Sequence, residues 1–124
     1  ACCFSSRGRR SPWRRRRLSE RRKMKPVVVF LHGSGDSGFG AKQYVQSLLE
    51  PQEYGLFTWE FPTATKVPYS LNGGATSSVW YDRVGGLDPS FPEQTATVDA
   101  SAARVVDVVS GHVATGVDPG RVAV

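Results

Sequence analysis

The feature that most constrains the fold is an apolar run, Val27 to Leu31, that passes directly into the glycine-rich segment HGSGDSGFG, residues 32–40. A continuous apolar run rich in β-branched residues is typical of a strand that is buried on both faces of a parallel sheet. Glycines placed directly after such a strand let the backbone turn sharply and approach a ligand closely. The sequence therefore predicts an α/β fold with a functional loop at the carboxyl end of an early strand.

The remainder of the chain alternates helical and strand patterns, and Pro51 and the proline-rich segment after residue 61 interrupt them. Helical spacing of apolar residues, short β-branched runs and proline positions together define the expected elements. They are a helix over 41–49, a strand over 58–61, a long loop over 62–91, a helix from Pro92 to about Gly111 and a strand over 121–124.

The glycines of the loop permit a first interpretation as a dinucleotide-binding turn. Gly33, Gly35 and Gly38 have the G-x-G-x-x-G spacing that brings a pyrophosphate against a helix N-terminus. Glu60 stands twenty-two residues beyond Gly38, where an acid binds a ribose hydroxyl in such sites. Against this interpretation, two residues separate the motif from the first periodic helical residue, and the segment after the second strand is not a βαβ crossover.

Two further interpretations involve hydrolysis. Gly35 to Gly38 spell G-D-S-G and resemble the nucleophile loop of trypsin-like serine proteases, but that fold consists of antiparallel barrels and its histidine lies far ahead of the serine. Ser37 and Gly38 are therefore interpreted as turn residues. The segment His32 to Gly35 instead fits an oxyanion-hole loop, in which backbone N–H groups face the negative charge of a tetrahedral intermediate.

Charge is distributed unevenly along the chain. Residues 1–25 hold eleven of the sixteen Lys and Arg and one of the eleven acidic residues, so the remainder is mildly acidic. A block of like charge without an apolar period predicts a disordered arm at 1–25 beside a folded domain at 26–124. Four interpretations of the arm stay open: a nucleic-acid-binding or nuclear-localisation tail, a mitochondrial transit peptide, a membrane-surface patch, or an upstream extension not native to the folded protein, with Met24 as the true start.

The cysteines and the hydropathy bear on location. Cys2 and Cys3 are the two cysteines of the chain and both lie in the arm, so no disulfide framework is expected and a reducing, cytoplasmic compartment is predicted. No apolar stretch reaches the roughly 18 to 20 residues of a membrane span, so membrane contact is expected to be peripheral at most. Trp13 is the one aromatic side chain among the arginines, which gives bases little to stack on and makes nucleic acid an unlikely partner.

Four segments stand in the order found in the acyl-protein thioesterase family of α/β-hydrolases, and the resemblance covers essentially all of residues 27–124. They are VVFLHGSGDSG, FPTA, NGGATSSVWYDR and GVDPGRVAV. The chain resembles the lysophospholipase-like branch of that family in particular. The resemblance implies an incomplete α/β-hydrolase fold, the N-terminal half of a mainly parallel sheet with flanking helices. In the family the strand at 121–124 leads into the turn with the nucleophilic serine, so the nucleophile, Asp and His are expected beyond Val124.

The resemblance also implies roles for individual residues. The backbone N–H of Ser34 would be the first oxyanion donor, and a serine in place of the leucine of long-chain-selective members favours a short acyl pocket. Asp36 is expected to accept hydrogen bonds from loop N–H groups, and Trp80 and Tyr81 to pack in the core rather than to contact substrate. The expected supporting residues are His32, Gly33, Gly35, Asp36, Trp80, Tyr81 and Asp82.

The histidines are not expected to act as the catalytic base. His32 is expected to hold the adjacent loop, and His112 to cap the end of the long helix in solvent. The implied activity is serine-dependent hydrolysis of acyl esters or of S-acylated proteins through an acyl-enzyme, with no metal and no cofactor. Because no G-x-S-x-G is present, the chain by itself is expected to be an inactive fragment. The alternatives are a non-catalytic nucleic-acid-binding fragment and a dinucleotide-binding domain.

Overall fold

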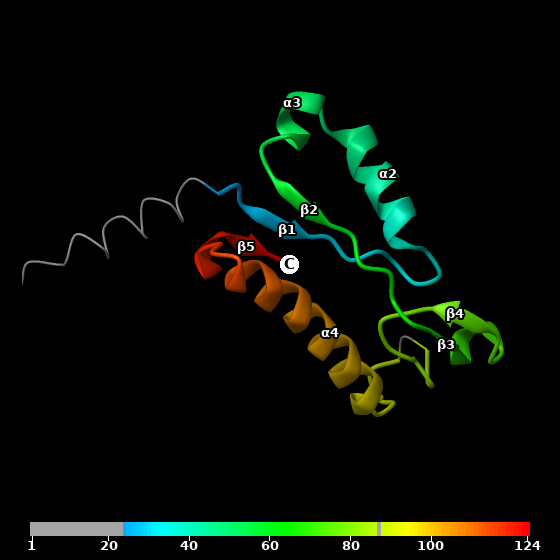
Figure 1. Ribbon diagram of the computed structural model, residues 1–124. Helices are drawn as coiled ribbons and strands as arrows, with labels where there is room; N and C mark the ends of the chain where they lie inside the picture. Colours follow the sequence, from blue (N-terminus) through cyan, green and yellow to red (C-terminus); the bar gives the residue numbers. More distant parts are fainter. Residues whose placement is uncertain (1–23, 87) are drawn as a thin grey trace, which may run out of the picture.

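A computed structural model describes residues 24–86 and 88–124, so almost all of the predicted basic arm lies outside the described residues. Strand β1 (Val27–Val29) is the central strand of a three-stranded sheet with the order β2-β1-β5 (Figure 1). Strands β2 (Thr58–Glu60) and β5 (Val122–Ala123) both run parallel to β1. The α/β architecture and the three strands predicted from the sequence are confirmed, each strand being one or two residues shorter than expected.

Helices cover both faces of the sheet. Helices α2 (Gly38–Leu48) and α3 (Pro51–Tyr54) lie on one side of it, and α4 (Thr95–Ala114) lies on the other (Figure 1). The buried core contains Val27, Val29 and Val117, with Val108, Val109 and Val122 packed against it. The two β1 valines are each 1% exposed, as expected for an apolar run in the middle of a covered sheet.

Helix α2 begins earlier than predicted, at Gly38 rather than at residue 41. The Ser37 hydroxyl caps it by accepting a hydrogen bond from the Gly40 N–H at 3.1 Å. A Cβ at Gly38 would lie 1.9 Å from the carbonyl oxygen of Phe61, so the helix start approaches the end of β2 in a way that only glycine allows. The predicted two-residue gap between the glycine motif and the helix is therefore wrong, because the glycines are themselves part of the first turn.

The segment 62–91 is not the continuous loop that was predicted. Strands β3 (Lys66–Pro68) and β4 (Thr76–Ser78) form an antiparallel pair. They are joined through the short 3₁₀ helix η1 (Ser70–Asn72) and two glycines, Gly73 and Gly74, whose φ angles are +60° and +82°. These strands are three residues long, and only one residue of β4 is buried. Such short, largely polar strands have no apolar period that the sequence could reveal.

The long helix α4 begins at Thr95, three residues later than the predicted Pro92, and ends at Ala114 rather than near Gly111. Gln94 precedes its first turn and makes no side-chain capping bond. No residue of α4 is buried, and Val106 on its apolar stripe is 59% exposed. Only part of the apolar surface of α4 is therefore covered by the described elements.

Candidate functional site

The glycine-rich loop leaves the carboxyl end of β1 and is exposed from Gly33 to Asp36. Gly35 adopts a φ of +84°, which L side chains rarely adopt, and its N–H donates to the Ser78 carbonyl at 2.8 Å. The Asp36 carboxylate accepts a hydrogen bond from the Ser37 N–H at 2.7 Å, the kind of contact predicted for it. The Asp36 N–H donates to the Gly33 carbonyl at 3.2 Å, which closes a tight turn around Ser34.

Ser34 lies at the exposed centre of this turn. The N–H groups of Gly35 and Asp36 are hydrogen-bonded to other backbone groups. By contrast, nothing within residues 24–86 and 88–124 accepts a hydrogen bond from the Ser34 N–H. A backbone N–H that is exposed at a fixed turn is free to donate to a carbonyl or oxyanion of a bound molecule. The loop therefore has the geometry of a preformed hydrogen-bond donor site.

His32 is buried beneath the loop, with 4% of its surface exposed. Its Nε2 accepts a hydrogen bond from the Ala64 N–H at 2.9 Å, and its Nδ1 lies 2.7 Å from the Gly33 carbonyl oxygen. Because a backbone N–H can only donate, Nε2 is unprotonated and the ring proton is on Nδ1, where it donates to Gly33. The imidazole thus ties the start of the loop to residue 64, which is the holding role expected of it.

Trp80 supports the same segment from another side. Its indole Nε1 donates to the His32 carbonyl at 2.9 Å, and the two ring centroids are 5.3 Å apart at 41°. The Trp80 carbonyl accepts a hydrogen bond from the Ser101 hydroxyl of α4. Trp80 therefore links the loop to α4, and the residue is half-buried.

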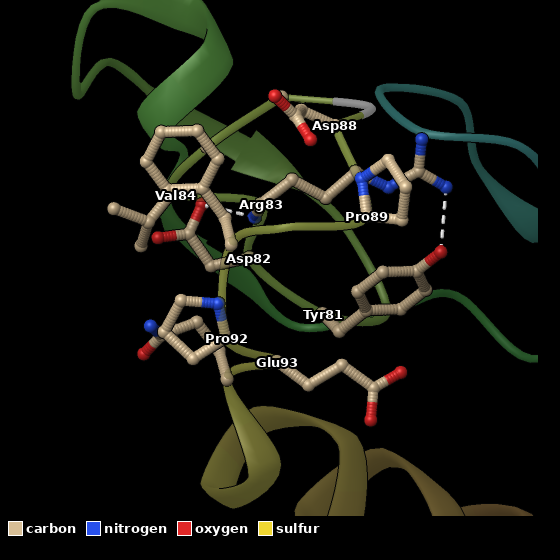
Figure 2. A pocket seen from close by; sticks show the side chains of 12 residues that line it. Tyr81, Asp82, Arg83, Val84, Asp88, Pro89, Pro92 and Glu93 are labelled. Atoms are coloured by element: carbon tan, nitrogen blue, oxygen red, sulfur yellow. Dashed lines mark hydrogen bonds between the residues drawn. The ribbon is translucent and has the colours of Figure 1, made fainter.

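Tyr81 and Asp82 lie close to Trp80 in sequence but do not join the loop. Figure 2 shows their side chains on opposite sides of the chain. The Tyr81 hydroxyl accepts a hydrogen bond from Arg83, whose guanidinium carbon lies 4.9 Å from the centre of the tyrosine ring. Tyr81 is 38% exposed, so the core packing expected for it is wrong, and these contacts do not reach the loop.

Asp82 is directed toward η1, the 3₁₀ helix between strands β3 and β4. Its carboxylate accepts hydrogen bonds from the Ser70 N–H at 2.8 Å and from the Ser70 hydroxyl at 2.7 Å. These two hydrogen bonds, the backbone one first, lower the pKa of Asp82 below its ordinary value. Asp82 also borders a surface cavity of about 640 Å³, lined by segments 81–86 and 88–94, to which the 32–36 loop does not contribute (Figure 2).

Glu60 and His112 form a contact that the sequence did not suggest. Glu60 Oε1 lies 2.9 Å from His112 Nε2, and this contact joins β2 to α4. The histidine side chain is only 21% exposed, so the solvated helix cap predicted for His112 is wrong. The carboxylate proposed for a ribose hydroxyl is already engaged by the protein.

The N–H groups at the start of α2 are also engaged. The Gly38 N–H donates to the Thr63 hydroxyl at 2.9 Å, and the Gly40 N–H donates to Ser37. A pyrophosphate at this helix start would have to displace those partners. Thr63, Ala64 and Ser78 were not recognised from the sequence as neighbours of the loop. Thr63 and Ala64 belong to the FPTA segment that carries part of the family resemblance, whereas no local pattern marks Ser78.

An apolar groove of about 360 Å³ begins beside the loop at Leu31 and runs along α4. Its lining residues are Leu31, Trp80, Tyr81, Val98, Ser101, Ala102, Val105 and Val106. No helix in the part of the chain that the structure covers is long and apolar enough to cross a membrane.

Residues 17–124 match the sequence profile of the Phospholipase/Carboxylesterase family. The chain belongs to the Phospholipase/Carboxylesterase family. The match extends over the strands, the glycine-rich loop and the helices described above, and it confirms the family resemblance seen in the sequence.

Individual proteins and solved structures that resemble the chain are consistent with this family assignment. Lysophospholipase-like protein 1 of Mus musculus is 29% identical over 96 residues, covering 77% of this chain and 40% of its own. The crystal structure of SOBER1 from Arabidopsis thaliana superposes with a TM-score of 0.70 at 27% identity, covering 80% of this chain and 47% of SOBER1. Acyl-protein thioesterase 2 of Zea mays superposes with a TM-score of 0.59 at 37% identity, covering 69% of this chain and 35% of that one.

The fold is thus part of the α/β-hydrolase fold. The chain spans less than half the length of these family relatives.

Proposed function

We propose that this chain provides the oxyanion-binding part of a serine hydrolase that cleaves acyl esters or the thioesters of S-acylated proteins. The observation that carries the proposal is the backbone N–H of the exposed residue Ser34, which is held in a fixed turn and has no acceptor among the residues that the structure describes. In acyl transfer such a donor stabilises the oxyanion of the tetrahedral intermediate and does not need to be reorganised during the reaction.

We propose further that the nucleophile, acid and base come from residues outside this chain. The sequence contains no G-x-S-x-G, and both histidines are held by structural contacts, His32 with Ala64 and His112 with Glu60. Without a nucleophile no acyl-enzyme can form, and an oxyanion donor alone gives little turnover. The chain by itself is therefore expected to be inactive.

The exposed apolar surface supports the proposal that the nucleophile, acid and base come from residues outside this chain. The groove along α4 is almost wholly apolar, and β5 has no strand on its outer edge among the elements described. An apolar helix face beside an unpaired strand edge favours association with further strands and helices. We propose that the remaining elements of an α/β-hydrolase domain cover this face and bring the nucleophile to the loop.

The location follows from the same proposal. Residues 24–124 contain no cysteine, so the folded part needs no oxidising compartment. We propose a cytoplasmic enzyme with at most peripheral membrane contact, and fractionation of cells that express a tagged chain tests this.

The experiment joins residues 24–124 to the part of Arabidopsis SOBER1 that follows the region matched by this chain. The fusion is expected to hydrolyse p-nitrophenyl acetate and an S-acylated peptide, whereas residues 24–124 alone are expected to be inactive. A folded but inactive fusion, or clear turnover by the chain alone, would contradict the proposal. Ala102→Asp in the groove should impair the fusion, and Ala103→Asp, exposed next to it but outside the groove, serves as the matched control.

A further inference from the structure

Ser78 is a buried polar residue that touches the loop from the hairpin. It is 6% exposed and is the last residue of β4, a strand that lies near the loop following β1 (Figure 1). Its hydroxyl donates to the Ala64 carbonyl at 2.9 Å, and its own carbonyl accepts the Gly35 N–H at 2.8 Å. One residue thus binds both the loop and the segment on which the loop rests.

These contacts are part of a longer chain of hydrogen bonds in which every member donates to the next. The Gly35 N–H donates to Ser78, and Ser78 donates to the Ala64 carbonyl. The Ala64 N–H then donates to His32 Nε2, and His32 Nδ1 donates to the Gly33 carbonyl. The chain starts at Gly35 and returns to Gly33, so it closes around the residue between them.

We propose that Ser78 is a positioning residue for the Ser34 N–H, because its hydroxyl closes the ring of hydrogen bonds that fixes the two peptide groups flanking Ser34. This inference rests on the proposed function only in the role it gives to Ser34. The ring itself is a property of the chain and can be tested without any hydrolase activity.

The chemistry of the ring explains why a hydroxyl is needed at residue 78. Ala64 contributes only backbone atoms, so its carbonyl must find a donor and its N–H an acceptor within a buried space. His32 provides the acceptor and Ser78 provides the donor. Both backbone groups of Ala64 are attached to the same Cα, so loss of the Ser78 hydroxyl is expected to leave residue 64 less well fixed and thereby to weaken the His32 contacts as well.

The test uses nuclear magnetic resonance on the full 124-residue chain with Ser78→Ala, and with Ser77→Ala as the matched control. Ser77 is the preceding residue on β4, is half-buried, and its hydroxyl makes none of the ring's hydrogen bonds. Two signals are followed: the hydrogen exchange rate of the Gly35 amide and the ¹⁵N shifts of the His32 ring, which report which nitrogen carries the proton. Ser78→Thr, which keeps the hydroxyl, is the rescue variant.

Ser78→Ala is expected to speed exchange at Gly35 by roughly tenfold relative to Ser77→Ala and to release His32 from its single Nδ1–H form. Exchange at Val28 in β1 is expected to stay unchanged, and Ser78→Thr to restore both signals. Equal effects of Ser78→Ala and Ser77→Ala, an unchanged His32 tautomer, or a matching rise at Val28 would each overturn the positioning role. If the ring responds as expected but the SOBER1 fusion is inactive, the proposed function fails and the role of Ser78 in ordering the loop stands.

Discussion

The indole N–H of Trp80 is bonded to the backbone carbonyl of His32 at 2.9 Å, although the two residues are 48 positions apart in the sequence. This contact holds the residue before the glycine loop, while the His32 ring holds the loop itself through Gly33. Side chains beneath the loop therefore hold it in place, and its backbone groups are the ones that can bind a molecule from outside. A donor site of this kind depends on the shape of the turn more than on the side chain at Ser34.

Trp80→Phe keeps an aromatic ring but removes the donor to His32. The expected loss in free energy of unfolding is about 1–2 kcal/mol, because one hydrogen bond is lost and a carbonyl is left unpaired. Urea unfolding measures the loss, and the backbone amide signals of residues 33–36 should shift. Trp59→Phe is the matched control, since Trp59 donates in the same way to the Tyr54 carbonyl at 2.9 Å, away from the loop. Unchanged loop signals in Trp80→Phe would contradict the account.

Gly38→Ala tests the close approach between α2 and the end of β2. The new Cβ would lie 1.9 Å from the Phe61 carbonyl oxygen, and neither backbone can move freely, so we expect a loss of about 2–3 kcal/mol in unfolding free energy. Gly111→Ala is the comparison, because it lies within α4 with nothing within 4 Å of the new Cβ. That variant should gain about 0.5–1 kcal/mol from helix propensity. Thermal unfolding of both variants measures the difference. Only a small loss of stability in Gly38→Ala would contradict the close approach of Gly38 to Phe61.

The hydrogen bonds of Asp82 predict an acid-dependent contribution to stability. The Ser70 backbone and hydroxyl donors lower the pKa of Asp82 in the folded state, so its stabilising effect is complete above the ordinary aspartate pKa. The effect is lost as the pH falls through the lowered folded pKa, below about pH 4. The stability difference between the unchanged chain and Asp82→Asn should therefore be constant from about pH 5 to pH 7 and shrink in acid. Ser70→Ala should reduce this pH dependence, and a difference that grows in acid would have the wrong sign.

The dinucleotide interpretation predicts that NAD stabilises the fold, whereas the hydrolase interpretation does not. A ligand that binds only the folded state stabilises it by RT ln(1 + [L]/Kd), so the unfolding temperature rises with the ligand concentration. Because the Gly38 and Gly40 N–H groups and the Glu60 carboxylate are already bonded within the protein, we expect no shift with NAD. A concentration-dependent rise in unfolding temperature would favour the dinucleotide site.

The sequence allowed the sheet and the loop to be predicted because both depend on local patterns. The apolar run of β1 and the glycine spacing after it are visible within fourteen residues. The ring of hydrogen bonds around Ser34 could not be predicted from the sequence, since Ala64 takes part only through backbone atoms and Ser78 is 14 positions further along. The start of α4 was misplaced for a related reason: Pro92 is a good first-turn residue, but the helix begins three residues later without any side-chain cap.

The most direct test of the central claim replaces Ser34 in the active SOBER1 fusion. Ser34→Pro removes the donor N–H, whereas Ser34→Ala keeps it and removes only the hydroxyl. The account predicts that Ser34→Pro lowers kcat on p-nitrophenyl acetate by about 10²- to 10³-fold, with unfolding temperature as the check on folding, and that Ser34→Ala retains activity. A folded Ser34→Pro fusion with undiminished kcat, or an equal loss in Ser34→Ala, would contradict it.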